Sequence, residues 1–265
     1  MRSARRSSGA ATRARRSAAD PAARVVALVK GLDPPVRAAS ARRARDPLGG
    51  ACAVSLGRIA ASTPIEITRG LFRWSAPHPD WNPQATPGSS ADWEQMVGSV
   101  LYELPDTVVL FDPLLPAAEE RESFLEWLDE RVGGRPVSVL TTIHWHRRDR
   151  AQIAERYRAN SPRAWNMLPR GVQEWPLRGA GETLYWLPAV LALVAGDRLV
   201  GVDGQQLRVC PESWLTRVRA NRAEVAGLMR PLLELPIERV LVSHGEPVLR
   251  AGHGALARAI AEARA

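Results

Sequence analysis

The sequence has little that could cross-link it or hold it in a membrane. Its 265 residues include two cysteines, Cys52 and Cys210, which cannot build a disulfide framework and favour a reducing compartment. No apolar run approaches the roughly 20 residues that a membrane-spanning helix needs. The N-terminal arginines are not followed by the apolar region of a secretion signal. We therefore expect a cytoplasmic protein without a membrane partner.

Acidic and aromatic residues are scarce in the first quarter of the chain. The formal net charge is +8, yet residues 1–62 hold 12 Arg and 1 Lys against three Asp, so the other residues carry −2. A segment this rich in Ala, Arg, Ser and Pro cannot bury enough apolar surface to offset its ordering entropy. We predict a disordered basic tail over 1–62 and a folded domain over 63–265.

Apolar patterning predicts that strands and helices are mixed along the folded domain, as in an α/β or α+β protein. A Pro-rich loop, 75–91, interrupts the pattern; His78, Trp81 and Trp93 either wall a substrate pocket there or are aromatics that pack the loop itself. The expected strands are 66–74, 97–103, 107–111, 137–140, 182–187, 191–194 and 239–243, and the expected helices are 117–132, 150–158, 211–235 and 253–263.

Potential metal ligands follow three of these strands. His144 and His146 come after the strand 137–140, Asp197 after 191–194, and His244 after 239–243. On an extended backbone, residues i and i+2 point the same way, so both histidines of the pair would reach one point. Because strand ends meet along one edge of a sheet, these side chains are expected to converge on one divalent ion. Zinc is favoured, with iron or manganese as alternatives.

The order of these segments resembles the metallo-β-lactamase fold, a four-layer αββα sandwich, over about residues 65–265. The resemblance rests on Val109-Leu110-Phe111-Asp112-Pro113, His144-Trp145-His146, Ala195-Gly196-Asp197 and Ser243-His244-Gly245. It implies that Asp197 is a bridging metal ligand and that His244 is the final histidine ligand. Asp112 is a candidate to orient a ligand histidine.

The central motif of that family, His-x-His-x-Asp-His, is only partly present. His144 and His146 match its first two ligands, but Arg148 stands in place of Asp and Asp149 in place of the third His. A one-residue slip would instead put Asp149 in the Asp role and Arg150 in the His role. The segment 188–191, where the family has its next histidine, contains no ligand. The sequence therefore favours one ion over a two-metal centre.

These observations support three functions in descending order. The first is a metal-dependent hydrolase acting on a small-molecule ester, thioester, lactone or phosphodiester, with Asp149 as metal ligand and proton acceptor. The second is a degenerate relative that has lost its metal and serves as a binding or structural module. The third, nucleic-acid binding through the basic tail, is disfavoured by the nearly neutral domain. Neither the substrate nor the oligomeric state follows from the sequence.

Overall fold

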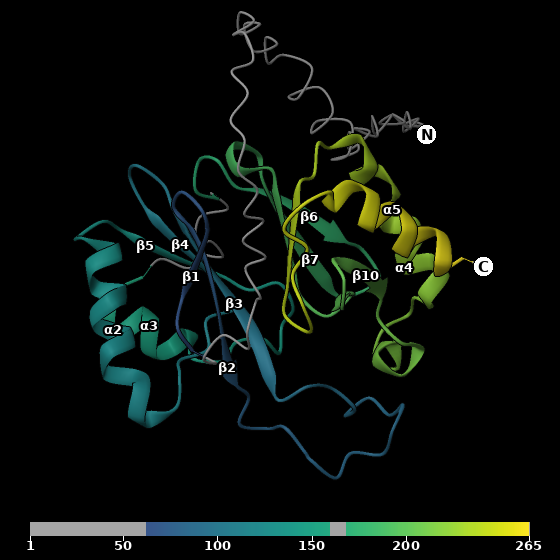
Figure 1. The fold of residues 1–265 in the computed structure, drawn as a ribbon, viewed down its shortest axis with the longest axis horizontal. Coiled ribbons are helices and arrows are strands. Elements are labelled where there is room, and N and C mark those ends of the chain that lie inside the picture. The colour runs from purple at the N-terminus through teal and green to yellow at the C-terminus, as the bar shows by residue number, and fades with distance from the viewer. Residues whose placement is uncertain (1–61, 160–167, 265) are drawn as a thin grey trace, which may run out of the picture. The chain divides into compact units, whose positions relative to one another are not determined.

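Two β-sheets form the centre of the fold in the computed structural model, which describes residues 62–159 and 168–264 (Figure 1). The predicted tail, apart from Ser62, lies outside the described residues. The first sheet has the strand order β1-β2-β3-β4-β5, and only the β4–β5 pair is parallel. Its strands are β1 Ile65–Thr68, β2 Leu71–Pro77, β3 Met96–Glu103, β4 Val108–Phe111 and β5 Val137–Leu140.

The second sheet has the strand order β11-β8-β7-β6, and its β8–β11 pair is parallel. A separate antiparallel ribbon is formed by the strands β9 and β10. The strands of this sheet and of the ribbon are β6 Gln173–Leu177, β7 Glu182–Leu187, β8 Ala192–Ala195, β9 Leu199–Val202, β10 Gln206–Val209 and β11 Arg239–Val242.

Apolar side chains pack between the two sheets because strand residues alternate between faces. On β3, Val100 and Tyr102 face the second sheet, where Tyr185 of β7 and Val194 of β8 belong to the same cluster. The intervening Leu101 points the other way, toward the helices that cover the first sheet. One hydrophobic core therefore joins the sheets face to face.

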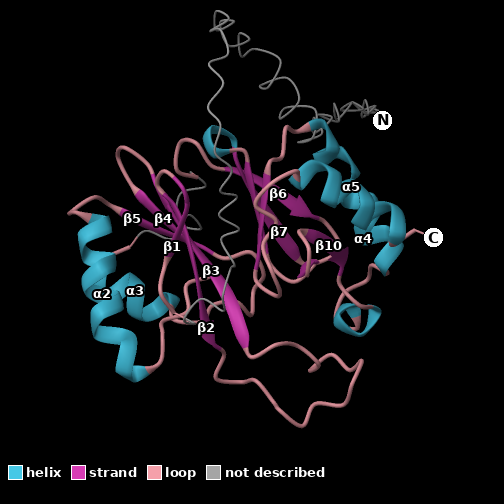
Figure 2. Cartoon of the chain, in the orientation of Figure 1, coloured by secondary structure: helices cyan, strands magenta, loops and turns pink. Residues whose placement is uncertain are grey.

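Helices cover the outer faces of both sheets (Figure 2). Phe124 and Leu128 of α2 and Ile153 of α3 pack on the outer face of the first sheet, whereas α4 and α5 contact β6, β10 and β11 on the other side. These layers confirm the predicted αββα sandwich. The helices are α2 Ala118–Val132, α3 Arg150–Tyr157, α4 Arg222–Met229 and α5 Gly252–Glu262, with 3-10 turns η2 Pro188–Val190, η3 Glu212–Leu215 and η4 Arg230–Glu234.

Two predicted elements differ from the structure, and in each case local turn chemistry is the reason. The strand predicted over 66–74 is the hairpin β1–β2, because Gly70 adopts the left-handed conformation (φ 74°) that a turn requires. The helical stretch predicted over 211–235, with a break near Gly227 or Pro231, is divided into η3, α4 and η4: α4 ends at Met229, next to Pro231, and the additional division arises because a capping box between Asn221 and Glu224 starts a new helix. Among the described residues, no helix is long and apolar enough to cross a membrane.

The parallel pairs place four strand ends close together. Strands β4 and β5 run side by side in the first sheet, and β8 and β11 do so in the second. Asp112 follows β4, and the turn with His146 follows β5. Asp197 comes after β8, and His244 comes after β11. This edge of the sandwich carries the candidate site.

Candidate metal centre

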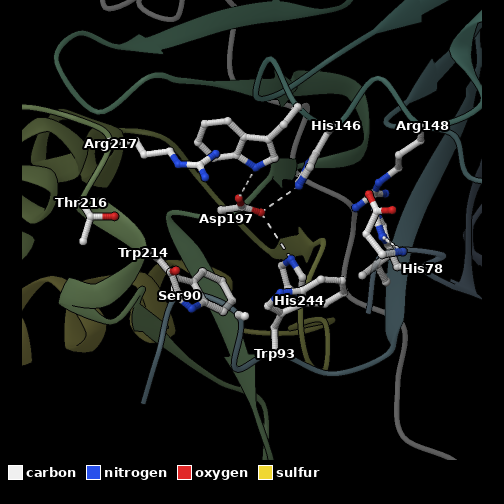
Figure 3. A pocket seen from close by; sticks show the side chains of 14 residues that line it. His78, Ser90, Trp93, His146, Arg148, Asp197, Trp214, Thr216, Arg217 and His244 are labelled. Carbon is white, nitrogen blue, oxygen red and sulfur yellow. Dashed lines mark hydrogen bonds and ion pairs between the residues drawn. The ribbon is translucent and has the colours of Figure 1, made fainter. Parts of the chain in front are cut away.

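Three buried side chains from distant parts of the sequence converge at this edge (Figure 3). Potential ligand atoms of His146, Asp197 and His244 all lie within 4.8 Å of one another. The Oδ1 atom of Asp197 is 2.9 Å from Nε2 of His146 and 3.4 Å from Nε2 of His244. Each residue is less than 10% exposed. The three residues, called here the three-residue cluster, offer two imidazoles and one carboxylate to a common point.

His146 is oriented by Asp112, the first residue after β4. The Oδ2 atom of Asp112 lies 3.0 Å from Nδ1 of His146, and its Oδ1 atom accepts the backbone N–H of Thr142 at 2.9 Å. With Nδ1 donating to Asp112, Nε2 is the nitrogen that faces Asp197; it carries a proton in the metal-free protein and would bind a metal once that proton is lost, as in metal-binding histidines that are held by a carboxylate. Burial lowers the pKa of His146, but Asp197 and Asp112 outweigh it and raise that pKa to about 9.

Asp197 is held by the indole of Trp145 and by hydrogen bonds to its backbone. Its Oδ2 atom accepts the indole N–H of Trp145 at 2.8 Å. The Glu182 carboxylate accepts the backbone N–H groups of Gly196, Asp197 and Arg198 at 2.8 to 2.9 Å, which fastens the turn after β8. Burial alone would raise the pKa of Asp197, but His146 and His244 hold it well below its ordinary value. The free oxygen, Oδ1, therefore carries negative charge.

His244 is held by two tryptophan rings. The ring centroids of Trp214 and Trp93 lie 5.0 and 5.6 Å from that of His244, both in edge-on orientations. The backbone carbonyl of His244 also accepts the N–H of Gly201 at 2.9 Å, which ties the turn after β11 to β9. The imidazole therefore has little freedom to leave the cluster.

The three-residue cluster fits a divalent cation. Within the described residues, Oδ1 of Asp197 is buried and has no hydrogen bond of good geometry; its nearest neighbours are Nε2 of His146 and Nε2 of His244, at the ion-pair distances of 2.9 and 3.4 Å. Two imidazole nitrogens and one carboxylate oxygen with an open fourth position are the donor set of catalytic zinc. A bound ion would replace the proton that His146 shares with this carboxylate oxygen.

Two predicted site residues lie outside the three-residue cluster. His144 is exposed, with its ring 4.4 Å from that of Trp145. The expected extended backbone is wrong here, because residues 144–149 form successive turns and the two histidines point apart. Asp149 is half-buried, and its Oδ2 atom accepts the N–H of Leu115 at 2.7 Å. The structure thus places neither the second histidine nor the expected proton acceptor at the cluster.

Arg148 lies within the same turn as His146. Arg148 has a positive φ of 37°, and its Nη1 atom donates to the carbonyls of Gly98 and Asp112, both at 2.8 Å. Burial lowers its pKa from the ordinary value. Its guanidinium thus lies beside the backbone that carries Asp112. No spacing pattern in the sequence could have indicated this position, because Gly98 is fifty residues away in the chain.

A cavity of about 430 Å³ opens over the three-residue cluster. His78 and Trp93 line it, as expected from the Pro-rich loop, whereas Trp81 lines a neighbouring cavity and donates its indole N–H to the Trp93 carbonyl. The sequence reasoning missed three further lining residues, Trp145, Trp214 and Arg217. His144 and Asp149 are not part of this lining. Aromatic walls and charged groups therefore surround the site.

Comparisons with known proteins yielded structural matches alone. No protein-family model matches the chain, and no curated protein matches it. A metallo-β-lactamase from Erythrobacter litoralis is 14% identical with a TM-score of 0.53, over 78% of this chain and 97% of that one. A metallo-β-lactamase from Hirschia baltica is 12% identical with a TM-score of 0.51, over 76% of this chain and 97% of that one. VMB-1 is 11% identical with a TM-score of 0.51, over 76% of this chain and 95% of that one. At sequence identities this low, the structural similarity is evidence for a shared fold.

Proposed function

We propose that this chain, which has the metallo-β-lactamase fold, is a metal-dependent hydrolase of an ester, thioester, lactone or phosphodiester. The observation that carries the proposal is the convergence of His146, Asp197 and His244 within 4.8 Å at the floor of a cavity. The known metallo-β-lactamases with this fold support it at the level of the superfamily. Zinc is the ion that the two imidazoles and one carboxylate favour, with iron or manganese as alternatives.

A divalent ion held there would supply Lewis acidity, lowering the pKa of water and polarising a carbonyl or phosphoryl oxygen. The chain's own residues orient the side chains that would bind this ion. Asp112 holds His146 in the tautomer that turns Nε2 toward the centre, and Trp145 takes one oxygen of Asp197 so that the other faces the centre. Trp93 and Trp214 exclude water from one side of His244.

His78 is the candidate for moving a proton at the rim of the cavity. Its Nδ1 atom accepts the backbone N–H of Asp80 at 3.2 Å, so in the neutral ring the proton is on Nε2. Burial, followed by the charge of Arg148, lowers its pKa, which keeps the ring neutral near pH 7. This role replaces the one predicted for Asp149, whose carboxylate is engaged with Leu115.

Metal removal tests the proposal directly. The protein purified without chelators should hold about one equivalent of zinc by elemental analysis, because the three-residue cluster offers one set of ligands. Dialysis against a strong chelator should abolish hydrolysis of p-nitrophenyl acetate, and added zinc should restore it. A folded protein that binds no metal after incubation with zinc, iron or manganese would instead support the alternative function, a degenerate binding or structural module.

The affinity for the ion should depend steeply on pH. Because the metal-free protein holds a proton on His146 with a pKa of about 9, an ion must displace that proton at neutral pH. Zinc affinity should therefore rise about tenfold per pH unit between roughly pH 7 and 9 and then level off. Competition with a chromogenic chelator at several pH values measures this, and an affinity independent of pH over that range would contradict it.

A further inference from the structure

Arg198 directly follows Asp197 in the chain and is completely buried, with 0% of its surface exposed. Burying a guanidinium costs free energy unless other groups take the place of its water. No carboxylate of the described residues lies within ion-pair distance of Arg198. The reason for this buried charge must therefore lie in its other neighbours.

The neighbours of Arg198 belong to three segments that are distant in the sequence. Its Nε atom donates to the carbonyl of Ala180, between β6 and β7, at 2.9 Å. Its Nη1 atom donates to the carbonyl of Trp214, in η3, at 3.4 Å. Its guanidinium carbon lies 5.6 Å from the ring centroid of Trp145, in the turn after β5. A guanidinium is attracted to the negatively polarised face of an aromatic ring, so Arg198 connects its own turn to all three segments.

The contact with Trp145 bears directly on Asp197. The indole N–H of Trp145 donates to Oδ2 of Asp197 at 2.8 Å, and Oδ1 of Asp197 faces the imidazoles of His146 and His244 (Figure 3). Because Trp145 is 36% exposed, water competes with its indole for Oδ2. A guanidinium packed on the ring favours the orientation in which the N–H reaches Asp197, and thereby keeps Oδ1 turned toward the two imidazoles.

The contact with Trp214 supports the same site less strongly. The ring of Trp214 lies edge-on to His244, with centroids 5.0 Å apart, and Arg198 holds the backbone of that tryptophan. At 3.4 Å this hydrogen bond is long, and hydrogen bonds weaken with distance. The main influence of Arg198 on the cluster is therefore expected through Trp145.

We propose that Arg198 is a positioning residue for the metal ligand Asp197 and that it acts through the indole of Trp145. Arg198 does not touch the ion; it orients the ring whose N–H orients the carboxylate. Outer partners of metal ligands typically change metal affinity by about 10- to 100-fold. The inference rests on the proposed function, because it concerns the affinity and geometry of the ion on which hydrolysis would depend.

Zinc affinity and the spectrum of bound cobalt test this role. Arg198→Lys keeps the positive charge but removes the planar guanidinium, and Trp145→Phe keeps an aromatic ring but removes the N–H. In each variant the zinc affinity, measured by competition with a chromogenic chelator, should fall about tenfold or more. The visible absorption bands of the cobalt-loaded protein should also change, because the carboxylate of Asp197 loses its fixed orientation. Unchanged zinc affinity in folded Arg198→Lys would overturn the proposal.

The double variant decides whether Arg198 acts through Trp145. Substitutions of residues that act as one unit are not additive. In the Trp145→Phe protein, Arg198→Lys should therefore lower the zinc affinity by only about threefold or less. If the two losses multiply in full, Arg198 does not act through the indole and the proposal is wrong.

Arg239→Lys is the matched control. Arg239 is partly buried at the start of β11, and its Nη1 atom donates to the carbonyl of Val190 at 3.0 Å. The substitution removes a comparable hydrogen bond to a carbonyl at the end of the strand that is opposite His244. The zinc affinity and the cobalt spectrum should stay unchanged in this variant, even where its stability falls. An equal loss of zinc affinity in Arg239→Lys would show a general effect of stability and would contradict the positioning role.

The indole N–H of Trp145 gives a readout that needs no metal. Among the signals of the nine tryptophans in a nitrogen–proton NMR spectrum, the one absent from Trp145→Phe belongs to Trp145. A hydrogen bond slows exchange of its proton with water, so exchange should be about tenfold faster in Arg198→Lys. Unchanged exchange would contradict the proposal. Faster exchange in a protein that binds no zinc would support the link from Arg198 to Trp145 and count against the hydrolase function alone.

Trp145→Phe keeps the test decisive if Arg198→Lys does not fold. The exposed ring of Trp145 makes this substitution mild for the fold. Weaker zinc binding in Trp145→Phe would support the route from the indole to Asp197. Unaltered zinc affinity in folded Trp145→Phe would overturn the proposal, because the indole would then have no influence on the ligand.

Discussion

Replacing His146 by alanine should remove both the bound metal and the hydrolytic activity. The substitution deletes one of the three ligands of the cluster, leaves the carboxylate of Asp112 without its imidazole partner and leaves Asp197 with His244 alone. Loss of metal assistance is worth several kcal/mol of transition-state stabilisation, so turnover of p-nitrophenyl acetate should fall roughly a thousandfold. Elemental analysis and initial rates, with circular dichroism to verify the fold, measure the result.

His144→Ala is the matched control for this variant. It removes the same side chain two residues earlier, from an exposed position where the ring packs on Trp145. Zinc content and turnover should stay within about twofold of the unaltered protein, since an exposed side chain that offers no ligand to the cluster contributes little. Retained metal and activity in His146→Ala, or their loss in His144→Ala, would mean that the cluster is assigned to the wrong histidine.

Gly201→Ala should strongly destabilise the protein and displace His244. A Cβ atom at this position of β9 would overlap the backbone carbonyl of Glu246, which cannot move aside like the end of a flexible side chain. Gly201 also donates its N–H to the His244 carbonyl at 2.9 Å, so the clash pushes away the turn that carries this ligand. We expect a loss of roughly 3 kcal/mol in the free energy of unfolding, as for severe overpacking, together with reduced zinc content.

The control for this variant is a glycine with open space around it. Gly227 is exposed on α4, and an added Cβ would meet no atom within 4 Å. Gly227→Ala should therefore stabilise the protein by roughly 0.5–1 kcal/mol, through the better helix propensity of alanine. Urea denaturation of both variants measures the difference. Equal stability of Gly201→Ala and the unaltered protein would show that β9 and the turn after β11 are not in close contact.

Most strands and helices were predicted from local patterns, but β6, β9 and β10 were not. The mostly apolar segments 137–140 and 239–242 are strands in the structure, because a strand of a covered parallel pair needs mostly apolar side chains whatever its neighbours are. Asp197 and His244 follow such strands by two residues. Their proximity could be inferred because the carboxyl ends of neighbouring parallel strands lie at the same edge.

The turn after β5 was not readable in the same way. His144 and His146 look equivalent in the sequence, but the chain leaves the strand before them, and only His146 turns inward. Its direction depends on Asp112 and Thr142, and on the packing of Gly196 against Thr142 from the other sheet. A spacing rule for extended strands cannot describe a turn whose direction is set by such distant contacts.

By itself the sequence indicated the strands that end at the site and the carboxylate and histidine that follow β8 and β11; the layered architecture followed from the resemblance to the metallo-β-lactamase fold. The strands depend on periodicity and burial, which each segment carries in its own residues. Only the tertiary structure decided that His146 rather than His144 joins Asp197, that Asp149 does not, and that Arg148 lies at the cavity. The reason is that turns take their direction from contacts with residues far away in the chain, such as the hydrogen bond from Arg148 to the Gly98 carbonyl.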